Sequence, residues 1–298
     1  MPELPDLTVY LEALQRRVLG EVLEGIRIVS PFVLRTVDPA KETLAGRRVQ
    51  HLTRIGKQIL LTLEEDHFIV LHLMISGRLH WKKARAAIPK RNGLAAFDFA
   101  SGSLILTESS RKKRAALYLL EDREALAVLD RGGLEPLTSD AENFRTALQA
   151  RNHTLKRALT DPAVFAGIGN AYSDEILHAA RLSPFKQTQA LSADEIQRLH
   201  RATVQTLSHW TDRLRLECGD GFPEKVTAFR AGMAVHGRYA EPCPVCGAPV
   251  QRIVYAENEA NYCAKCQTGG KLLADRALSR LLKSNWPKTL EALERDAG

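Results

Sequence analysis

Two Cys-x-x-Cys pairs constrain the fold of this chain more than any other feature of its sequence. They comprise Cys243, Cys246, Cys263 and Cys266, with 16 residues between the two pairs. Four thiolates at this spacing suit one tetrahedral Zn²⁺ ion, and four protein ligands leave no open position for chemistry. The segments Val250–Tyr255 and Ala260–Tyr262 between the pairs predict a β-hairpin. We therefore expect one structural zinc per chain.

Length and composition indicate a globular protein of two domains. The chain has 298 residues, of which 45% are hydrophobic and 26% charged. Lysine and arginine outnumber aspartate and glutamate by 42 to 35, and the formal charge of +7 favours a polyanionic partner. We find no secretory signal and no apolar stretch of about 18 residues, so we expect a soluble, cytoplasmic protein with reduced cysteines. A redox role for either cysteine pair is disfavoured because no thioredoxin-like βαβ pattern surrounds it.

The order of the predicted elements indicates an α+β fold. Apolar residues recur with helical spacing over residues 6–19, and Gly20 follows where a helix end is expected. Strands are predicted at Gln58–Leu63, Phe68–Leu73, Ala96–Phe99 and Leu104–Thr107. Helices are predicted at 141–150, 152–160, 170–181 and 192–215.

These elements divide the chain into four parts. We expect a β-sandwich with a leading helix over 1–130 and a helical domain over 140–235, joined by the glycine-containing linker 131–136. A zinc-finger hairpin over 236–270 and a helical C-terminal tail over 271–298 follow.

Two further segments suggest binding and chemistry. In Gly167–Asn170, two glycines precede a predicted helix, where backbone N–H groups can bind an anion such as a DNA phosphate. A plain tight turn is the alternative. Pro2 follows Met1, and removal of Met1 would leave a secondary amine that can attack an aldehyde carbon, with Glu3 beside it as general acid or base. An ordinary N-terminus is the alternative here, and a solvated side chain is the alternative for Lys57.

Five separated motifs, taken together and in order, resemble the formamidopyrimidine-DNA glycosylase / endonuclease VIII family. They are Met1-Pro2-Glu3-Leu4-Pro5, Gly56-Lys57, His72-Leu73 with Ser76-Gly77, Gly167-Ile168-Gly169-Asn170 with Tyr172 and Glu175, and Val235-His236-Gly237-Arg238 leading through Glu241-Pro242-Cys243 into the zinc finger. The resemblance covers roughly residues 1–267. It implies that the helical domain contains a helix–two-turn–helix element. It also implies a partner, double-stranded DNA with damaged bases or abasic sites, and we expect a monomer to bind it.

The resemblance implies base-excision repair by a bifunctional glycosylase and abasic-site lyase. Such an enzyme flips a damaged base out of the stack. By match with the family motifs, Pro2 attacks the sugar C1′ and expels the base, with Glu3 as the acid. The resulting iminium undergoes β- and then δ-elimination, which nicks the strand. Lys57 and Asn170 hold phosphates in this scheme, and we also count Lys57 among the catalytic residues.

The wedge that fills the void left by a flipped base departs from the family pattern. The order Met74-Ile75 makes Ile75, or a displaced Met74, the wedge residue. The second wedge loop is here a basic run without the family's aromatic residue, and its Arg111 and Lys112 are expected to contact DNA. At position 6, Asp6 replaces the family's glutamate.

The zinc hairpin also departs from the pattern. Asn258 occupies the position of a phosphate-binding arginine, and it lies between Glu257 and Glu259, whose carboxylates would repel phosphate. We retain Asn258 as a DNA-binding prediction by position. The segment Gly219–Val226 differs from the family's lesion-covering loop, and a tail extends beyond Cys266.

These departures leave two alternative functions. The altered hairpin and wedge favour a non-catalytic binder of damaged or distorted DNA with the same fold, whereas intact Pro2, Glu3 and Lys57 favour an enzyme. A glycosylase with a more open pocket, for a bulky or crosslinked lesion, is the second alternative. The lesion itself is not predicted by the sequence.

Overall fold

The computed structural model describes residues 1–224, 226–255, 258–273 and 288–292. The chain forms two compact units, one of residues 1–132 with 209–228, and one of residues 133–208 with the described part of 229–298. The boundary at Gly132 lies within the segment 131–136 that we interpret as a linker. Most of the predicted tail 271–298 falls outside the described residues. No described helix is both long enough and apolar enough to cross a membrane.

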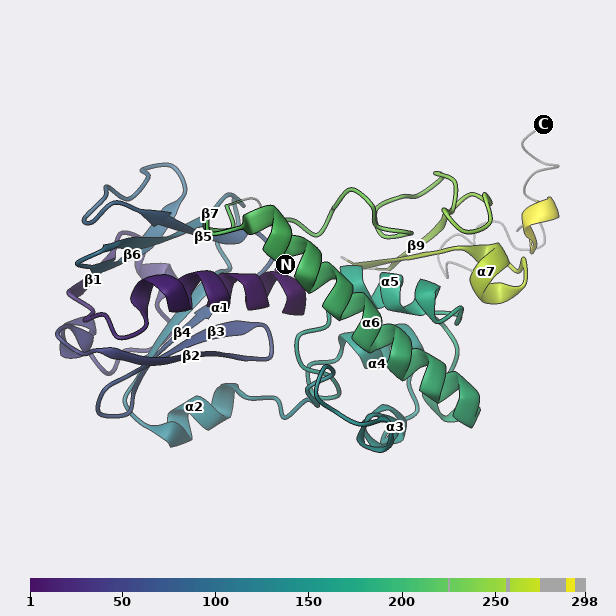
Figure 1. Cartoon of the computed structure of the whole chain (residues 1–298), viewed down its shortest axis with the longest axis horizontal. Coiled ribbons are helices and arrows are strands. Elements are labelled where there is room, and N and C mark those ends of the chain that lie inside the picture. Colours follow the sequence, from purple (N-terminus) through teal and green to yellow (C-terminus); the bar gives the residue numbers. More distant parts are fainter. Residues whose placement is uncertain (225, 256–257, 274–287, 293–298) are drawn as a thin grey trace. The chain divides into compact units, whose positions relative to one another are not determined.

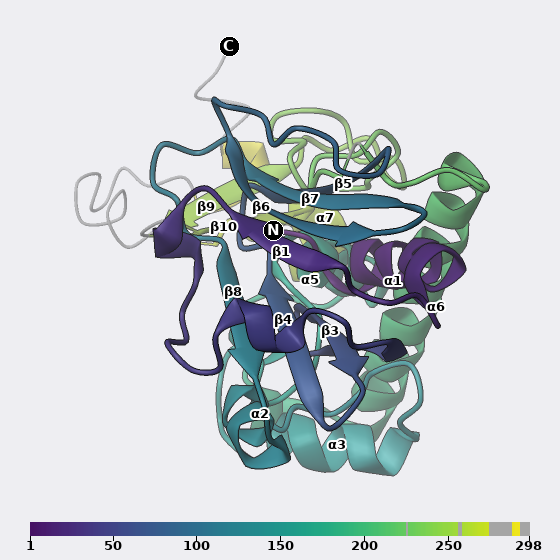
Figure 2. The same cartoon turned by 90° about the vertical axis from the view of Figure 1, so that its left-hand side faces the viewer.

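The first unit is built around two four-stranded antiparallel sheets. One sheet has the order β1-β6-β7-β5 and the other the order β2-β3-β4-β8. Figure 2 shows the two sheets lying face to face. The strands are β1 (Gly25–Ile28), β2 (Val49–Ile55), β3 (Gln58–Leu63), β4 (His67–His72), β5 (Gly77–Lys82), β6 (Gly93–Phe99), β7 (Gly102–Glu108) and β8 (Ala116–Leu120).

Alternation along the strands decides which side chains enter the core of this sandwich. In β4, Ile69 and Leu71 belong to the core between the sheets, whereas Phe68 and Val70 pack in a second cluster on the outer face. Leu126 of helix α2 (Arg123–Leu129) packs against that outer cluster. The second sheet is therefore covered on both faces around β4, which explains why β3, β4 and β8 are mostly apolar and buried.

Helix α1 (Leu4–Val18) closes one edge of the sandwich and contacts both sheets. The Tyr10 hydroxyl accepts a hydrogen bond from the backbone N–H of Leu79 in β5 at 3.4 Å, and the Gln15 side-chain amide donates to the Leu52 carbonyl in β2 at 3.4 Å. The helix ends before Gly20, whose φ of +79° suits a residue without a side chain. Two short 3-10 turns, η1 (Pro31–Val33) and η2 (Lys41–Leu44), link β1 to β2.

The second unit is helical and ends in a β-hairpin. Its helices are α3 (Ala141–Gln149), α4 (Leu155–Thr160), α5 (Asn170–Ala179), the long α6 (Ala193–Cys218), whose last residues belong to the first unit, and α7 (Ala264–Thr268); the 3-10 turn η3 spans Thr188–Ala190. The antiparallel strands β9 (Gln251–Tyr255) and β10 (Asn258–Tyr262) form the hairpin, and β10 contacts α5. Figure 1 labels these helices and β9, and Figure 2 labels β10.

The α+β fold predicted from the sequence is confirmed, and most predicted elements lie within a few residues of the observed ones. The strand Gln58–Leu63 coincides with β3. The helix expected over 152–160 begins only at Leu155, because Thr154 is extended and pairs with Gln187. Four strands of the sandwich, β1, β2, β5 and β8, were not predicted.

Candidate active site and metal centre

The amino terminus lies in a cluster of charged side chains in the first unit. Pro2, Glu3 and Asp6 are buried, and the Glu3 N–H donates to Asp6 Oδ2 at 2.9 Å, which caps α1. Burial lowers the pKa of the Met1 amine, which is the amino terminus of the chain. The carboxylates of Glu3 and Asp6 oppose this shift, and the cations of Arg78 and Lys57 reinforce it. An amine in this cluster is therefore more readily neutral than one exposed to water.

Lys57 reaches this cluster from the two-residue turn between β2 and β3. Gln58 follows it in β3, and His72 at the end of β4 pairs with Gln58. Burial and the nearby charge of Lys57 lower the pKa of His72 to about 4, so this imidazole is neutral at physiological pH. The fold thus brings Pro2, Glu3 and Lys57 together, and it adds Arg78, which the sequence analysis did not single out.

Ile75 lies at the tip of a tight turn between β4 and β5, Leu73–Gly77, which we call the wedge turn. The Gly77 N–H donates to the Leu73 carbonyl at 2.8 Å, and a Cβ on Gly77 would lie 2.2 Å from that oxygen, so only glycine fits. Met74 is half-buried with φ +51°, whereas Ile75 is 58% exposed. Of the two residues considered for the wedge, Ile75 is the more exposed.

The segment 109–114, which we call the basic loop, follows β7. Its four basic residues are exposed, and in the described part of the chain neither Arg111 nor Lys112 forms an ion pair. A hollow of about 590 Å³ adjoins the loop and is lined by Arg91, Asn92, Ser109, Ser110, Arg111 and Lys113. The loop therefore presents a strongly positive surface beside this hollow.

In the second unit, Asn170 is the first residue of α5. Gly169 is the N-cap and Gly167 has φ +85°, a conformation that favours glycine, so the Gly-x-Gly pattern forms a turn at the positive end of the helix dipole. The buried Lys156 ammonium donates to the Asn170 carbonyl at 2.7 Å and to Asp174 Oδ1 at 2.6 Å. An interior ion pair therefore fixes the start of α5 to α4.

Asp174 and Glu175 connect α5 to the segment that leads into the cysteine cluster. Asp174 Oδ2 accepts from His236 Nδ1 at 2.8 Å and from the Asn261 amide at 3.2 Å. Glu175 accepts three backbone N–H groups from residues 234–236. Burial raises the pKa of Glu175, and these hydrogen bonds lower it in part. The family motif had pointed to Glu175, but Asp174 and Lys156 were missed.

The four cysteine sulfurs converge in the second unit. All of their Sγ atoms lie within 4.8 Å of one another, with 4.0 Å between Cys243 and Cys266 and 3.4 Å between Cys246 and Cys263. A zinc tetrahedron with bonds of about 2.3 Å needs sulfurs about 3.8 Å apart, so the cluster suits one structural zinc. His178 Nε2 lies 3.3 Å from the Cys243 sulfur and belongs to the surroundings of the metal.

The hairpin of β9 and β10 has an asparagine and a carboxylate where a phosphate-binding surface would have positive charge. Asn258 begins β10, opposite Tyr255 of β9. On β9, the Arg252 guanidinium lies 4.6 Å from the ring centre of Tyr239, and one of its nitrogens is 3.9 Å from a carboxylate oxygen of Glu259. Arg252 therefore supplies a positive charge to the hairpin, but it lies opposite Asn261 rather than opposite Asn258.

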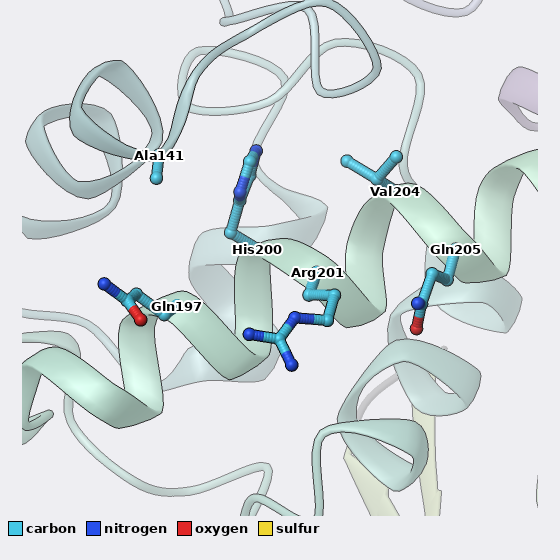
Figure 3. Close-up of a pocket in the computed structure, with 6 residues that line it drawn as sticks. All are labelled: Ala141, Gln197, His200, Arg201, Val204 and Gln205. Atoms are coloured by element: carbon cyan, nitrogen blue, oxygen red, sulfur yellow. The ribbon is translucent and has the colours of Figure 1, made fainter.

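Another hollow, of about 460 Å³, lies between α3 and α6 in the second unit. Figure 3 shows its lining, with Ala141 from α3 and Gln197, His200, Arg201, Val204 and Gln205 from α6. His200 bonds the Ser139 carbonyl at 3.0 Å and packs on Phe144, so it has a structural role. This hollow contains none of the residues predicted for catalysis.

Family comparisons agree with these features along most of the chain. The formamidopyrimidine-DNA glycosylase N-terminal domain matches residues 1–115, and the H2TH domain of the same glycosylase matches residues 133–212. The zinc finger found in FPG and IleRS matches residues 240–269. A formamidopyrimidine-DNA glycosylase of Desulforamulus reducens is 30% identical over 279 residues, covering 90% of this chain and 99% of the relative. The chain belongs to the formamidopyrimidine-DNA glycosylase family.

Other relatives of this glycosylase family cover the chain to different extents. An uncharacterized formamidopyrimidine-DNA glycosylase-like protein of Mycobacterium tuberculosis is 43% identical over 151 residues, which are 51% of this chain and 94% of that protein. The Lactococcus lactis Fpg in complex with a THF-DNA and an inhibitor has a TM-score of 0.78 at 26% identity, covering 90% of this chain and all of that one. The same enzyme with an abasic site containing DNA has a TM-score of 0.77 and 26% identity, covering 89% of this chain and 99% of that one.

Proposed function

We propose that this chain is a DNA-repair glycosylase with abasic-site lyase activity, and that the Pro2 amine is its nucleophile once Met1 is removed. The observation that carries the proposal is the cluster of Glu3, Asp6, Lys57 and Arg78 around the amino terminus, where Pro2 is buried and where burial lowers the pKa of the Met1 amine that precedes it. The similarity to enzymes solved with abasic or THF-containing DNA supports duplex DNA as the partner.

In the proposed lyase reaction, the neutral Pro2 nitrogen attacks the C1′ aldehyde of an abasic sugar. Loss of water leaves an iminium, which acts as the electron sink, so the C2′ proton can leave and the 3′ phosphate departs by β-elimination. A second elimination releases the 5′ phosphate. Glu3 is the acid and base for the proton transfers, and Lys57 neutralises a phosphate beside the sugar. Excision of a damaged base starts with the same attack at C1′, with the base as leaving group.

The DNA contacts in this proposal come from both units. Asn170, at the positive end of α5, binds a phosphate, and Asn258 lies in the hairpin at the position of the family's phosphate ligand. Ile75 fills the void left by the flipped nucleotide, and the basic loop with Arg111 and Lys112 contacts the duplex.

Borohydride trapping on duplex DNA with one abasic site tests the nucleophile. Mature protein with Met1 removed should give a covalent adduct, a form that retains Met1 should give none, and Pro2→Gly should give less because its primary amine is placed differently. Binding to a duplex with a tetrahydrofuran analogue, which has no aldehyde, is the matched control and should persist in all three forms. Equal trapping with and without Met1 would refute Pro2 as the nucleophile.

One observation favours a second function, binding without excision. The hairpin carries Asn258 beside Glu259 instead of an arginine, which weakens its grip on phosphates around a flipped nucleotide. We therefore expect cleavage at abasic sites to exceed excision of common oxidised purines. Tight binding of the tetrahydrofuran duplex with no adduct on abasic DNA would replace the enzyme by a binding protein of the same fold.

A further inference from the structure

Three turns of the first unit leave one sheet at the same end. Strands β5 and β6 begin there and β7 finishes there, as the pairing of Gly77 with Glu108 and of Gly93 with Thr107 shows. The wedge turn precedes β5, the turn Pro89–Gly93 precedes β6, and the basic loop follows β7. Residues that contact DNA in the proposed function are thus gathered around the last residue of β7.

That residue, Glu108, bonds all three turns. Its Oε1 accepts the Ser76 hydroxyl of the wedge turn at 3.1 Å. Its Oε2 accepts the backbone N–H groups of Arg114 and Ala115, at the end of the basic loop, at 2.8 and 3.0 Å. Its own N–H donates to the Asn92 carbonyl at 2.8 Å. One carboxylate oxygen therefore accepts a hydrogen bond from the wedge turn, and the other accepts hydrogen bonds from the end of the basic loop.

These bonds attach the basic loop to the end of β7, where the Lys113 ammonium also donates to the Glu108 backbone carbonyl. Glu108 is 1% exposed, so its carboxylate is stable there only because these donors replace water. The basic side chains of the loop are exposed, and the hollow of about 590 Å³ adjoins them. Removal of the carboxylate would leave two backbone N–H groups and one hydroxyl without their acceptor, and both turns would lose their common attachment.

We propose that Glu108 is a positioning residue that couples the wedge turn to the basic loop, so that Ile75 and Arg111 enter DNA as one unit. The proposal rests on the proposed function, because it assumes that these two side chains contact DNA. Glu108 itself is 1% exposed, so it acts on DNA only through the side chains of the two turns. Its effect is therefore expected on the cooperativity of the two contacts rather than on the chemical step.

A double-mutant cycle tests this coupling. Ile75→Ala, Arg111→Ala and the double variant are made in the parent and in Glu108→Ala, and Kd for a tetrahydrofuran duplex is measured by fluorescence anisotropy. In the parent, loss of one contact should already weaken the other, so the double variant should bind about five- to tenfold more tightly than the product of the single effects predicts. In Glu108→Ala the effects should multiply independently. Glu108→Gln, which keeps one acceptor oxygen, should retain part of the coupling.

Asp98 supplies a matched control in the same sheet. It is a buried carboxylate that also bonds a serine hydroxyl, that of Ser103, and it lies toward the far end of β6 from the three turns. Asp98→Ala should leave the coupling unchanged even where it lowers stability. Where Glu108→Ala fails to fold, Ser76→Ala removes only the bond to the wedge turn and should abolish the coupling.

The outcomes separate this inference from the function on which it rests. Coupling that persists in Glu108→Ala or in Ser76→Ala, or that is absent from the parent, would overturn the positioning role while the glycosylase proposal stands. A parent protein that bound the tetrahydrofuran duplex no more tightly than an undamaged duplex would instead contradict the proposed function.

Discussion

Replacing Lys156 with methionine should destabilise the second unit by about 3–5 kcal/mol, the usual effect of leaving one member of a buried ion pair alone. The Lys156 ammonium is 2.6 Å from Asp174 Oδ1, and the two side chains are 2% and 0% exposed. Methionine fills a similar volume, so the loss comes from the Asp174 carboxylate and the Asn170 carbonyl, which both lose the ammonium as donor, rather than from a cavity. Because His236 and Asn261 still donate to that carboxylate, we expect the lower end, about 3 kcal/mol.

The same unit provides the control for this experiment. Lys186 and Glu195 form an ion pair of the same length, 2.6 Å, but their side chains are 31% and 20% exposed. Because water screens this pair, Lys186→Met should cost less than about 1 kcal/mol. Urea unfolding followed by circular dichroism, with zinc in excess, measures both free energies of unfolding.

A third variant separates charge from packing. The double replacement Lys156→Met with Asp174→Asn removes both charges and should recover part of the stability lost in Lys156→Met. Equal losses in Lys156→Met and Lys186→Met would refute the argument, since they would show that burial of the Lys156 pair does not set its contribution.

Three further predictions concern metal, pH and salt. Cys246→Ser should lower the zinc content, measured by metal analysis, below one ion per chain, and it should unfold the hairpin because metal binding and folding are coupled at such sites. The control Cys218→Ser, outside the cluster, should retain one zinc ion per chain. The pKa of His72 is about 4 in the folded protein against 6.5 in the unfolded chain, so the unfolded chain binds the proton first as pH falls. The stability that the neutral His72 contributes is complete above the pKa of the unfolded chain and is lost as the pH falls towards the pKa of the folded protein. The free energy of unfolding should therefore fall by at most about 2 kcal/mol between pH 8 and pH 5. Urea unfolding at the two pH values should show a smaller loss for His72→Gln, and an identical loss would contradict this origin. Lys57→Ala should reduce the slope of log affinity for duplex DNA against log salt concentration by about one. The control Lys83→Ala, at an exposed residue directly after β5 and at the opposite end of that strand from the wedge turn, should leave the slope unchanged.

The sequence by itself determined the features that depend on neighbouring residues. The spacing within each Cys-x-x-Cys pair is a local property, and so is the hairpin between the pairs, which is why the zinc centre was predicted with all of its ligands. Helical periodicity located α1 and α3 to within a few residues. The opening Met-Pro-Glu and the Gly-x-Gly turn were recognised because each is a contiguous motif.

Only the tertiary structure decided which distant groups act together. Arg78 donates to the carbonyl of Val226, 148 residues away, and it contributes to the charge around the amino terminus. Asp174 accepts from His236 and Asn261, which follow it by 62 and 87 residues. No sequence pattern marks such pairs, because each partner taken alone looks like an ordinary polar group that water could solvate.

Glu108 shows the physical reason most clearly. In the sequence it is an acidic residue at the edge of a basic run, where a charge pattern predicts a solvated surface. In the fold it is 1% exposed, because antiparallel pairing of β5, β6 and β7 brings three turns to one sheet end and their polar groups surround its carboxylate. Burial of a charge depends on donors supplied by other segments, and the register of the sheet alone determines which segments those are.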